Sequence, residues 1–162
     1  MKFATFKSNG KSHYGAIHDA VIAALDSLFP EWPTLFNAVK NNGLSALEEA
    51  AEGADISHDS FEYDMVLPKV RRILCVGVNF SKRNAEYKDH SAMPKYMSLF
   101  VRLPSSFTGH NQPLIRSPEN KTLDCEGEVA IIIGKGGGRI SKARAYDHIA
   151  ALTISNGGTI HD

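Results

Sequence analysis

The chain lacks the features that direct a protein to nucleic acid, to a membrane or out of the cell. The 162 residues include 18 lysines and arginines in total and 18 aspartates and glutamates in total. The chain therefore has no excess positive charge to hold nucleic acid or an anionic membrane. The first residues contain no apolar stretch suited to a signal peptide, and no later segment approaches the ~18 apolar residues of a membrane span. We therefore expect a cytoplasmic protein that has neither nucleic acid nor membrane as a partner.

Cysteine is also scarce. Cys75 and Cys125 each lie within an apolar, strand-like segment and form no C-x-x-C pair. This pattern predicts two buried thiols in a reducing compartment, neither of them a metal ligand. The composition, with 43% hydrophobic and 22% charged residues, is that of a folded chain with one sizeable core and room for a small second module.

The amino-terminal part of the chain has the pattern of a small module. Residues 1–7 and 12–18 alternate as the two strands of a hairpin around the turn sequence SNGK. Pro30 would end a first helix, and Ser45 with Glu48 would form a capping box in the last one. Apolar residues at helical spacing place three helices after the hairpin, at 19–29, 33–43 and 44–53.

Strands predominate after about residue 70. Apolar runs predict them at 73–80, 97–103, 112–117, 128–134 and 149–155. We place a domain boundary near residues 58 to 70, with Pro68 in the linker. A small N-terminal α+β module then occupies residues 1–66 and a β-rich domain residues 67–162, and the fold class of the whole is α+β.

Two glutamates stand two positions apart at the start of the apolar strand at 128–134. Alternate side chains of a strand point to the same side, so Glu126 and Glu128 share one face, with Cα atoms ~6.5 to 7 Å apart. Two like charges this close are costly unless a positive ion lies between them, and all-oxygen ligation suits a hard cation such as Mg²⁺. The spacing alone also fits two solvated carboxylates at a strand edge, because E-x-E is a common pattern.

Two other polar segments have competing interpretations. NFSKRNAEYKD, at 79–89, directly follows the apolar run ILCVGV, and the end of a rigid strand often positions catalytic groups. Arg83 and Glu86 are three residues apart and would share a face of a helical turn there. The alternative is an ordinary surface ion pair. The tract GKGGGR, at 134–139, lacks the G-x-x-x-x-G-K-[ST] order of a phosphate loop and precedes a short helix at 141–149. We therefore interpret this tract as a tight turn.

Together these segments resemble the fumarylacetoacetate hydrolase family. ILCVGVNFSKRNAEY is similar to the family's strand and lid entry, SLFVRLPSSFTGHNQPLIRSPENKTLDCEGEVAIIIGK to its central stretch ending in the metal-binding E-x-E, and ALTISNGGTIHD to its third metal-ligand motif. The resemblance runs from about residue 70 to the end of the sequence, and the N-terminal module is similar to one that many members carry. It implies part of a mixed β-roll, with 73–78 and 128–133 as central strands, and a homodimer.

The resemblance also implies roles for single residues. The family's enzymes act on small oxo-acids with a divalent cation, Mg²⁺ or Mn²⁺, that holds the oxo-carboxylate end and stabilises an enolate. Glu126 and Glu128 are the implied metal ligands, and Arg102 is the implied group that binds the substrate carboxylate. The implied catalytic residues are Glu86, as base or orienter of a water, and Arg83, which stands where many members have a lid histidine but cannot act as a base.

Two further departures from the family pattern leave the activity open. The third ligand motif reads Asn156-Gly157-Gly158, where members have aspartate or glutamate after the asparagine, and the sequence ends at Asp162, where members continue. We therefore expect a truncated member of the family. One hypothesis is a divalent-metal-dependent isomerase or carbon–carbon hydrolase of small oxo-acids in aromatic catabolism. The alternative is a catalytically defective remnant that serves as a binding or assembly module.

Overall fold

The computed structural model describes residues 1–19, 21–53, 57–58, 60–80, 82–86 and 92–160 of the chain. The fold is α+β, as predicted. It divides into two compact units, one formed by Met1–Pro68 with Thr108–Asp162 and the other by Lys69–Phe107. The domain boundary between residues 66 and 67 stays a prediction. Among the described helices, none is long and apolar enough to cross a bilayer.

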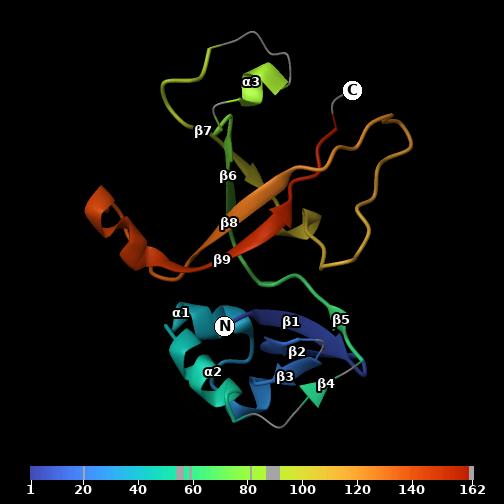
Figure 1. The fold of residues 1–162 in the computed structure, drawn as a ribbon, viewed down its shortest axis with the longest axis vertical. Coiled ribbons are helices and arrows are strands. Elements are labelled where there is room, and N and C mark those ends of the chain that lie inside the picture. The colour runs from blue at the N-terminus through green and yellow to red at the C-terminus, as the bar shows by residue number, and fades with distance from the viewer. Residues whose placement is uncertain (20, 54–56, 59, 81, 87–91, 161–162) are drawn as a thin grey trace. The chain divides into compact units, whose positions relative to one another are not determined.

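The amino-terminal residues form a five-stranded antiparallel sheet in the order β4-β3-β2-β1-β5 (Figure 1). The predicted hairpin is confirmed. Asn9 and Gly10 at its tip have φ angles of 49° and 74°, the left-handed conformations that a two-residue type I′ turn requires. The strands are β1 (Phe3–Ser8), β2 (Lys11–His18), β3 (Val21–Ala24), β4 (Ser57–His58) and β5 (Glu62–Tyr63).

The helix predicted at 19–29 is wrong. Val21–Ala24 form the strand β3, and a short 3₁₀ helix, η1 (Asp26–Leu28), follows it. A Cβ atom on Gly15 of β2 would collide with the Ala23 carbonyl oxygen, so the glycine allows β3 to approach β2 closely. Pairing across the sheet therefore outweighs the helical spacing of the apolar residues in this segment.

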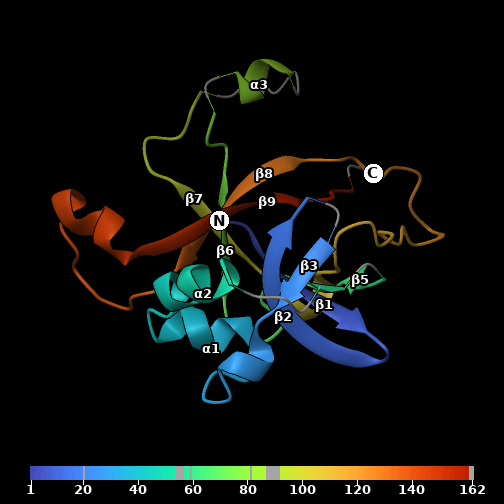
Figure 2. The same ribbon diagram turned by 60° about the horizontal axis from the view of Figure 1, so that its bottom comes forward.

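Two short helices, α1 (Leu35–Lys40) and α2 (Leu44–Ala51), lie side by side next to the sheet of β1 to β3 (Figure 2). Apolar side chains form one buried cluster between the helices and the sheet and a second cluster on the other sheet face. The first contains Tyr14, Ala16, Leu25, Leu35, Ala38, Leu47 and Ala51, and the second Ala4, Phe6, Ile22 and Ala24.

The capping box predicted for α2 is wrong. The N-cap of this helix is Gly43, and Ser45 lies inside the helix. The Trp32 ring packs against Gly43, where a Cβ atom would collide with it. The Glu48 carboxylate accepts a hydrogen bond from the amino-terminal ammonium of Met1 at 3.1 Å instead of reaching back to the cap. The start of α2 thus has a tertiary contact, between Trp32 and Gly43, in place of a side-chain cap.

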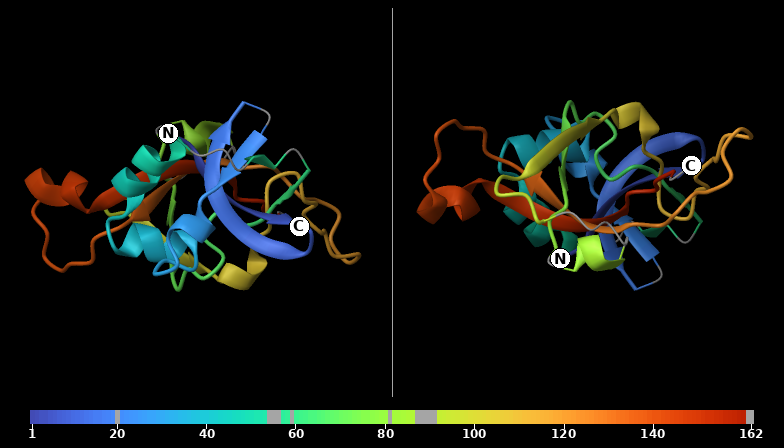
Figure 3. Two further views of the ribbon diagram at one scale, coloured as in Figure 1. Left: turned by 90° about the horizontal axis from the view of Figure 1, so that it is seen from below. Right: turned by 90° about the horizontal axis from the view of Figure 1, so that it is seen from above.

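The carboxyl-terminal residues form a two-stranded antiparallel ribbon of β8 (Gly127–Ile133) and β9 (Ile149–Asn156). The loop between them contains a 3₁₀ helix, η3 (Lys142–His148), where a short helix is predicted (Figure 3). The strand predicted at 112–117 is wrong. Pro113 has no N–H to donate to a ladder, and the Gln112 side chain instead donates to the Tyr63 carbonyl oxygen at 3.0 Å.

The unit Lys69–Phe107 contains a second antiparallel pair, β6 (Ile73–Gly77) with β7 (Ser98–Arg102). A one-turn helix, α3 (Arg83–Glu86), lies between the two strands in sequence, and a short 3₁₀ helix, η2 (Pro104–Ser106), follows β7. Within the described residues β6 pairs with β7 alone and β8 with β9 alone. The prediction that β6 and β8 are central strands is therefore wrong for this chain.

One face of the β8–β9 ribbon is apolar and exposed. The register places Val129 opposite Ile154 and Ile131 opposite Leu152, and these four side chains are 56–85% exposed. Cys125 lies on the same side by alternation and is exposed too. Cys75 is only half-buried, so the prediction of two buried thiols is wrong.

Candidate active site

Glu126 and Glu128 lie at the start of β8, where the end of β9 runs beside them. The Asn156 Oδ1 atom accepts a hydrogen bond from the Glu126 N–H at 3.0 Å. The Gly157 N–H donates to the Glu126 carbonyl oxygen at 2.8 Å. Both backbone groups of Glu126 are thus bonded to the 156–157 segment, although Glu126 itself precedes the strand. The Asn156 side chain thus holds the backbone of Glu126, a contact between positions 30 apart that no sequence spacing predicts.

Gly157 marks the point that both carboxylates approach. A Cβ atom at this position would lie 3.5 Å from Glu126 Oε2 and 3.5 Å from Glu128 Oε1. The two oxygen atoms are therefore separated by at most twice that distance. The φ angle of Gly157 is outside the left-handed region, so its conformation does not require glycine. The face shared by the two glutamates is as predicted from strand alternation.

The donor set of this pair fits a hard divalent cation. Two carboxylates supply oxygen ligands, and Mg²⁺ or Mn²⁺ commonly completes its coordination with water and substrate oxygens. Among the described residues no group of three or more aspartate, glutamate, histidine or cysteine side chains is placed to share one ion. The site therefore offers two protein carboxylates, with glycine at the third position of the motif.

Two leucines lie against Gly158, the residue after Gly157. Leu114 and Leu123 come from the loop that precedes β8, and a Cβ atom on Gly158 would lie 2.9 Å from Leu114 Cδ1 and 3.5 Å from Leu123 Cδ1. Backbone bonds between Asp124 and Thr159, of 2.8 and 3.1 Å, hold the loop against the end of β9. Gly158 thus faces apolar side chains, whereas Gly157 faces the carboxylates. No periodic pattern in the sequence predicts this apolar contact, because the leucines lie outside regular strands.

The other residues named from sequence lie in the unit Lys69–Phe107. Arg83 and Glu86 are the first and last residues of α3, which confirms the predicted helical turn. Arg102 ends β7 and is half-buried, and its guanidinium carbon lies 5.9 Å from the centre of the Phe100 ring. The structure therefore brings Glu126 and Glu128 together in one unit, and it places Arg83, Glu86 and Arg102 in the other.

Known proteins resemble this chain in sequence and in fold. The family profile described as Fumarylacetoacetate (FAA) hydrolase C-terminal matches residues 72–162. Oxaloacetate tautomerase YisK of Bacillus subtilis (strain 168) is 39% identical over 94 residues, which cover 57% of this chain and 31% of that protein.

Two solved structures share the fold. The fumarylacetoacetate hydrolase of psychrophilic Exiguobacterium antarcticum has a TM-score of 0.78 at 24% identity, over 98% of this chain and 56% of that one. Maleylpyruvate hydrolase of Sphingobium sp. SYK-6, solved in complex with manganese (II) ion and pyruvate, has a TM-score of 0.76 at 18% identity, over 99% of this chain and 59% of that one. The chain thus spans less than two thirds of the length of each of these proteins. Because the profile match covers more than half of the chain, the chain belongs to the fumarylacetoacetate hydrolase family.

Proposed function

We propose that this chain carries the divalent-metal site of an enzyme of small oxo-acids, with Glu126 and Glu128 as the metal ligands. The observation that supports this most is the approach of both carboxylates to the single point at Gly157. A bound Mg²⁺ or Mn²⁺ would supply a Lewis acid for the oxygens of an oxo-acid substrate. Keto–enol interconversion is the reaction class that we favour, because an arginine occupies the lid position where a histidine base would assist hydrolysis.

The remaining roles concern the proton and the substrate carboxylate. Glu86 is proposed to take a proton from the carbon beside the keto group while a water protonates the enolate oxygen, and both transfers run backwards from enol to keto. Arg102 is proposed to bind a substrate carboxylate through its planar fork of N–H donors. A guanidinium cannot act as a base, so we assign Arg83 to anion binding and not to proton transfer.

Manganese binding tests the metal ligands directly. Titration of the wild-type chain with Mn²⁺, followed by the electron paramagnetic resonance signal of the free ion, is expected to show one weak site. Glu126→Gln and Glu128→Gln should each weaken binding by about tenfold or more, because a lost ligand contact typically costs 10- to 100-fold in affinity. Glu119→Gln is the matched control, since Glu119 bonds to Ser117 in the preceding loop. Equal affinity in all four proteins would reject the site.

Oxaloacetate is the substrate to test first, because a relative of known activity is a tautomerase of this compound. The loss of enol absorbance should be faster with the chain and Mn²⁺ than with Mn²⁺ alone, and Glu86→Gln should abolish the difference. If the chain binds Mn²⁺ and yet leaves the rate unchanged, the reaction is refuted while the metal site stands.

One observation favours the second candidate, a catalytically defective chain that serves as a binding or assembly module. Gly157 supplies no side-chain ligand, and within the described residues no further acidic, histidine or cysteine group joins the glutamate pair. The exposed apolar face of β8 and β9 also supports association of two chains, which we propose as a homodimer. Metal binding without turnover, in a protein that self-associates, is the result expected for this candidate.

A further inference from the structure

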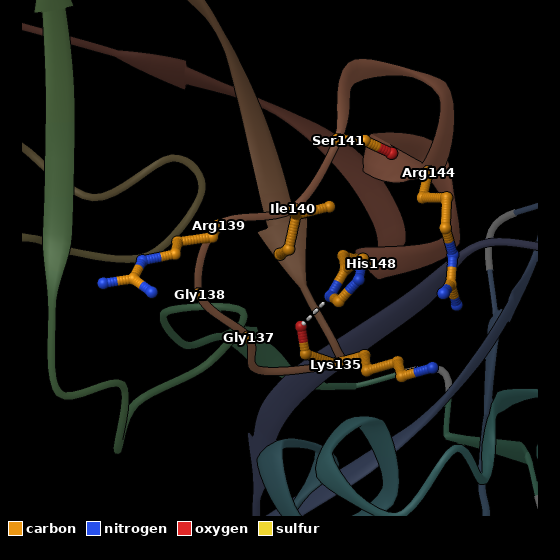
Figure 4. Close-up of a pocket in the computed structure, with 8 residues that line it drawn as sticks. All are labelled: Lys135, Gly137, Gly138, Arg139, Ile140, Ser141, Arg144 and His148. Atoms are coloured by element: carbon orange, nitrogen blue, oxygen red, sulfur yellow. Dashed lines mark hydrogen bonds between the residues drawn. The ribbon is translucent and has the colours of Figure 1, made fainter.

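A hollow with cationic walls lies in the loop between β8 and β9. Glu126 precedes β8 and the hollow follows it. The seven residues of the strand, about 23 Å at ~3.3 Å per residue, therefore separate the two places along the ribbon. The hollow has a volume of about 440 Å³, and its lining includes Lys135, Gly137, Arg139, Ile140, Arg144 and His148 (Figure 4).

This loop concentrates positive charge in a chain whose formal net charge is +0. Residues 134–148 contain four lysines and arginines but a single acidic residue, Asp147. Asp147 pairs with Arg144 through Nε at 3.3 Å, and both side chains are more than half exposed. The segment therefore keeps a net positive charge, which attracts a small anion. The chain as a whole has no excess positive charge to form an extended basic surface around this segment.

Two hydrogen bonds of His148, one from its ring and one to its carbonyl oxygen, hold the hollow in shape. His148 Nδ1 lies 2.8 Å from the Lys135 carbonyl oxygen, and the His148 carbonyl oxygen accepts from the Gly134 N–H at 3.0 Å. Because a carbonyl can only accept, Nδ1 carries the proton of this bond. A Cβ atom on Gly137 would lie 2.8 Å from Ile140 Cδ1 and 3.0 Å from His148 Cε1, so glycine lets the loop pass close to the ring.

The cationic side chains do not all extend the same way. In Figure 4 the Lys135 and Arg144 side chains extend on the side of the His148 ring, and Arg139 extends in the opposite direction. Lysine and arginine on one side of a hollow offer a point charge and a planar fork of donors, which together suit the oxygens of a phosphate group. A nucleic acid would need a longer positive surface than this neutral chain offers.

We propose that this hollow binds the phosphate group of a small molecule, with Lys135 and Arg144 as the charged contacts and His148 between them. The group can come from inorganic phosphate or from a phosphate ester. Binding at this place is independent of the metal site, because it involves neither Glu126 nor Glu128.

Titration of the ¹⁵N-labelled chain separates this proposal from general charge attraction. Inorganic phosphate and glycerol phosphate are added in parallel at constant ionic strength, and the amide shifts of Gly137 and Gly138 are followed. Lys135→Gln and Arg144→Gln should raise the dissociation constant about threefold to tenfold, whereas Arg139→Gln, which removes the same charge, should change it less than about twofold. The Lys135 carbonyl bond to His148 survives the substitution, and equal melting temperatures check the folds.

The outcomes are distinct. Saturable shifts confined to this loop, with the expected order of the variants, support the proposal, and the tighter of the two probes identifies the source of the phosphate group. Equal weakening in all three variants would mean that only the net charge matters, and this would overturn the proposal. An absence of saturable shifts with both probes would overturn it as well.

Discussion

Replacement of Gly157 by aspartate adds a third carboxylate beside Glu126 and Glu128. The new Cβ atom would lie 3.5 Å from one oxygen of each glutamate and 3.3 Å from Glu128 Cγ, so the neighbouring side chain must move by only a few tenths of an ångström. The backbone accepts the change, because the φ angle of Gly157 is not left-handed. The substitution is therefore expected to fold, and to change the site electrostatically.

Without metal, the third charge should destabilise the fold. A pair of unit charges ~4 Å apart interacts by about 1 kcal/mol in water, and the substitution creates two such pairs, so we expect a loss of about 1 to 2 kcal/mol. When a metal ion is bound, the same substitution should stabilise the fold. A restored ligand should raise the affinity for Mn²⁺ about tenfold or more, which corresponds to about 1.4 kcal/mol or more of added binding free energy.

The assay compares Gly157→Asp with Gly157→Asn, which has nearly the same shape and no charge. Melting temperatures with and without Mn²⁺, and the Mn²⁺ dissociation constant of each protein, are measured at low ionic strength. Only the aspartate variant should show a lower melting temperature without metal and a larger rise with it. If both variants bind Mn²⁺ alike, or if aspartate lowers stability without any response to metal, position 157 does not adjoin a metal site.

Three further changes test other parts of the structure. Asn156→Ala removes the acceptor of the Glu126 N–H bond and should weaken Mn²⁺ binding about threefold to tenfold, and unchanged binding would show that the bond does not position the ligand. Tyr14→Phe removes a buried hydroxyl that has no hydrogen-bond partner among the described residues, so the variant should be about 1 kcal/mol more stable in urea at neutral pH. Burial, with Asp26 and Glu31 nearby, raises the pKa of Tyr14 from 10.0 to about 12. The unfolded wild-type chain therefore loses this proton before the folded chain does, so the gain in stability of Tyr14→Phe over the wild type should grow as pH rises from about 10 to 12. A gain that stays constant over this range would contradict the prediction. Ile154→Lys places a charge on a side chain that is 85% exposed, and sedimentation velocity should show less association than in the wild type if this face joins two chains.

Local sequence signals predicted the parts of the fold that local chemistry determines. The Asn9-Gly10 pair adopts the left-handed angles of its turn, and the helices predicted at 33–43 and 44–53 contain α1 and α2. The two glutamates share one face because alternation along a strand needs no information from elsewhere. These features lie within a few residues of the signals that predict them.

The wrong predictions concern segments whose structure depends on distant partners. Val21–Ala24 form a strand because Gly15 in β2 leaves room for it. The bond between Asn156 and Glu126 joins positions 30 apart in the sequence, and no spacing rule predicts it. Central positions for β6 and β8 were expected from the resemblance to the family, but the number of neighbours of a strand depends on the other strands that are available.

Two like charges beside an apolar run are compatible with this fold because the strand has two different faces. Glu128 is exposed and Glu126 half-buried, whereas Val129 and Ile131 project to the opposite side of β8. Water therefore screens the repulsion between the carboxylates to about 1 kcal/mol, where a dry interior would multiply it. The same water limits how strongly the pair attracts a cation. An exposed pair without a third carboxylate should hold a divalent ion weakly, and this is why the charge at position 157 is expected to have so large an effect on affinity.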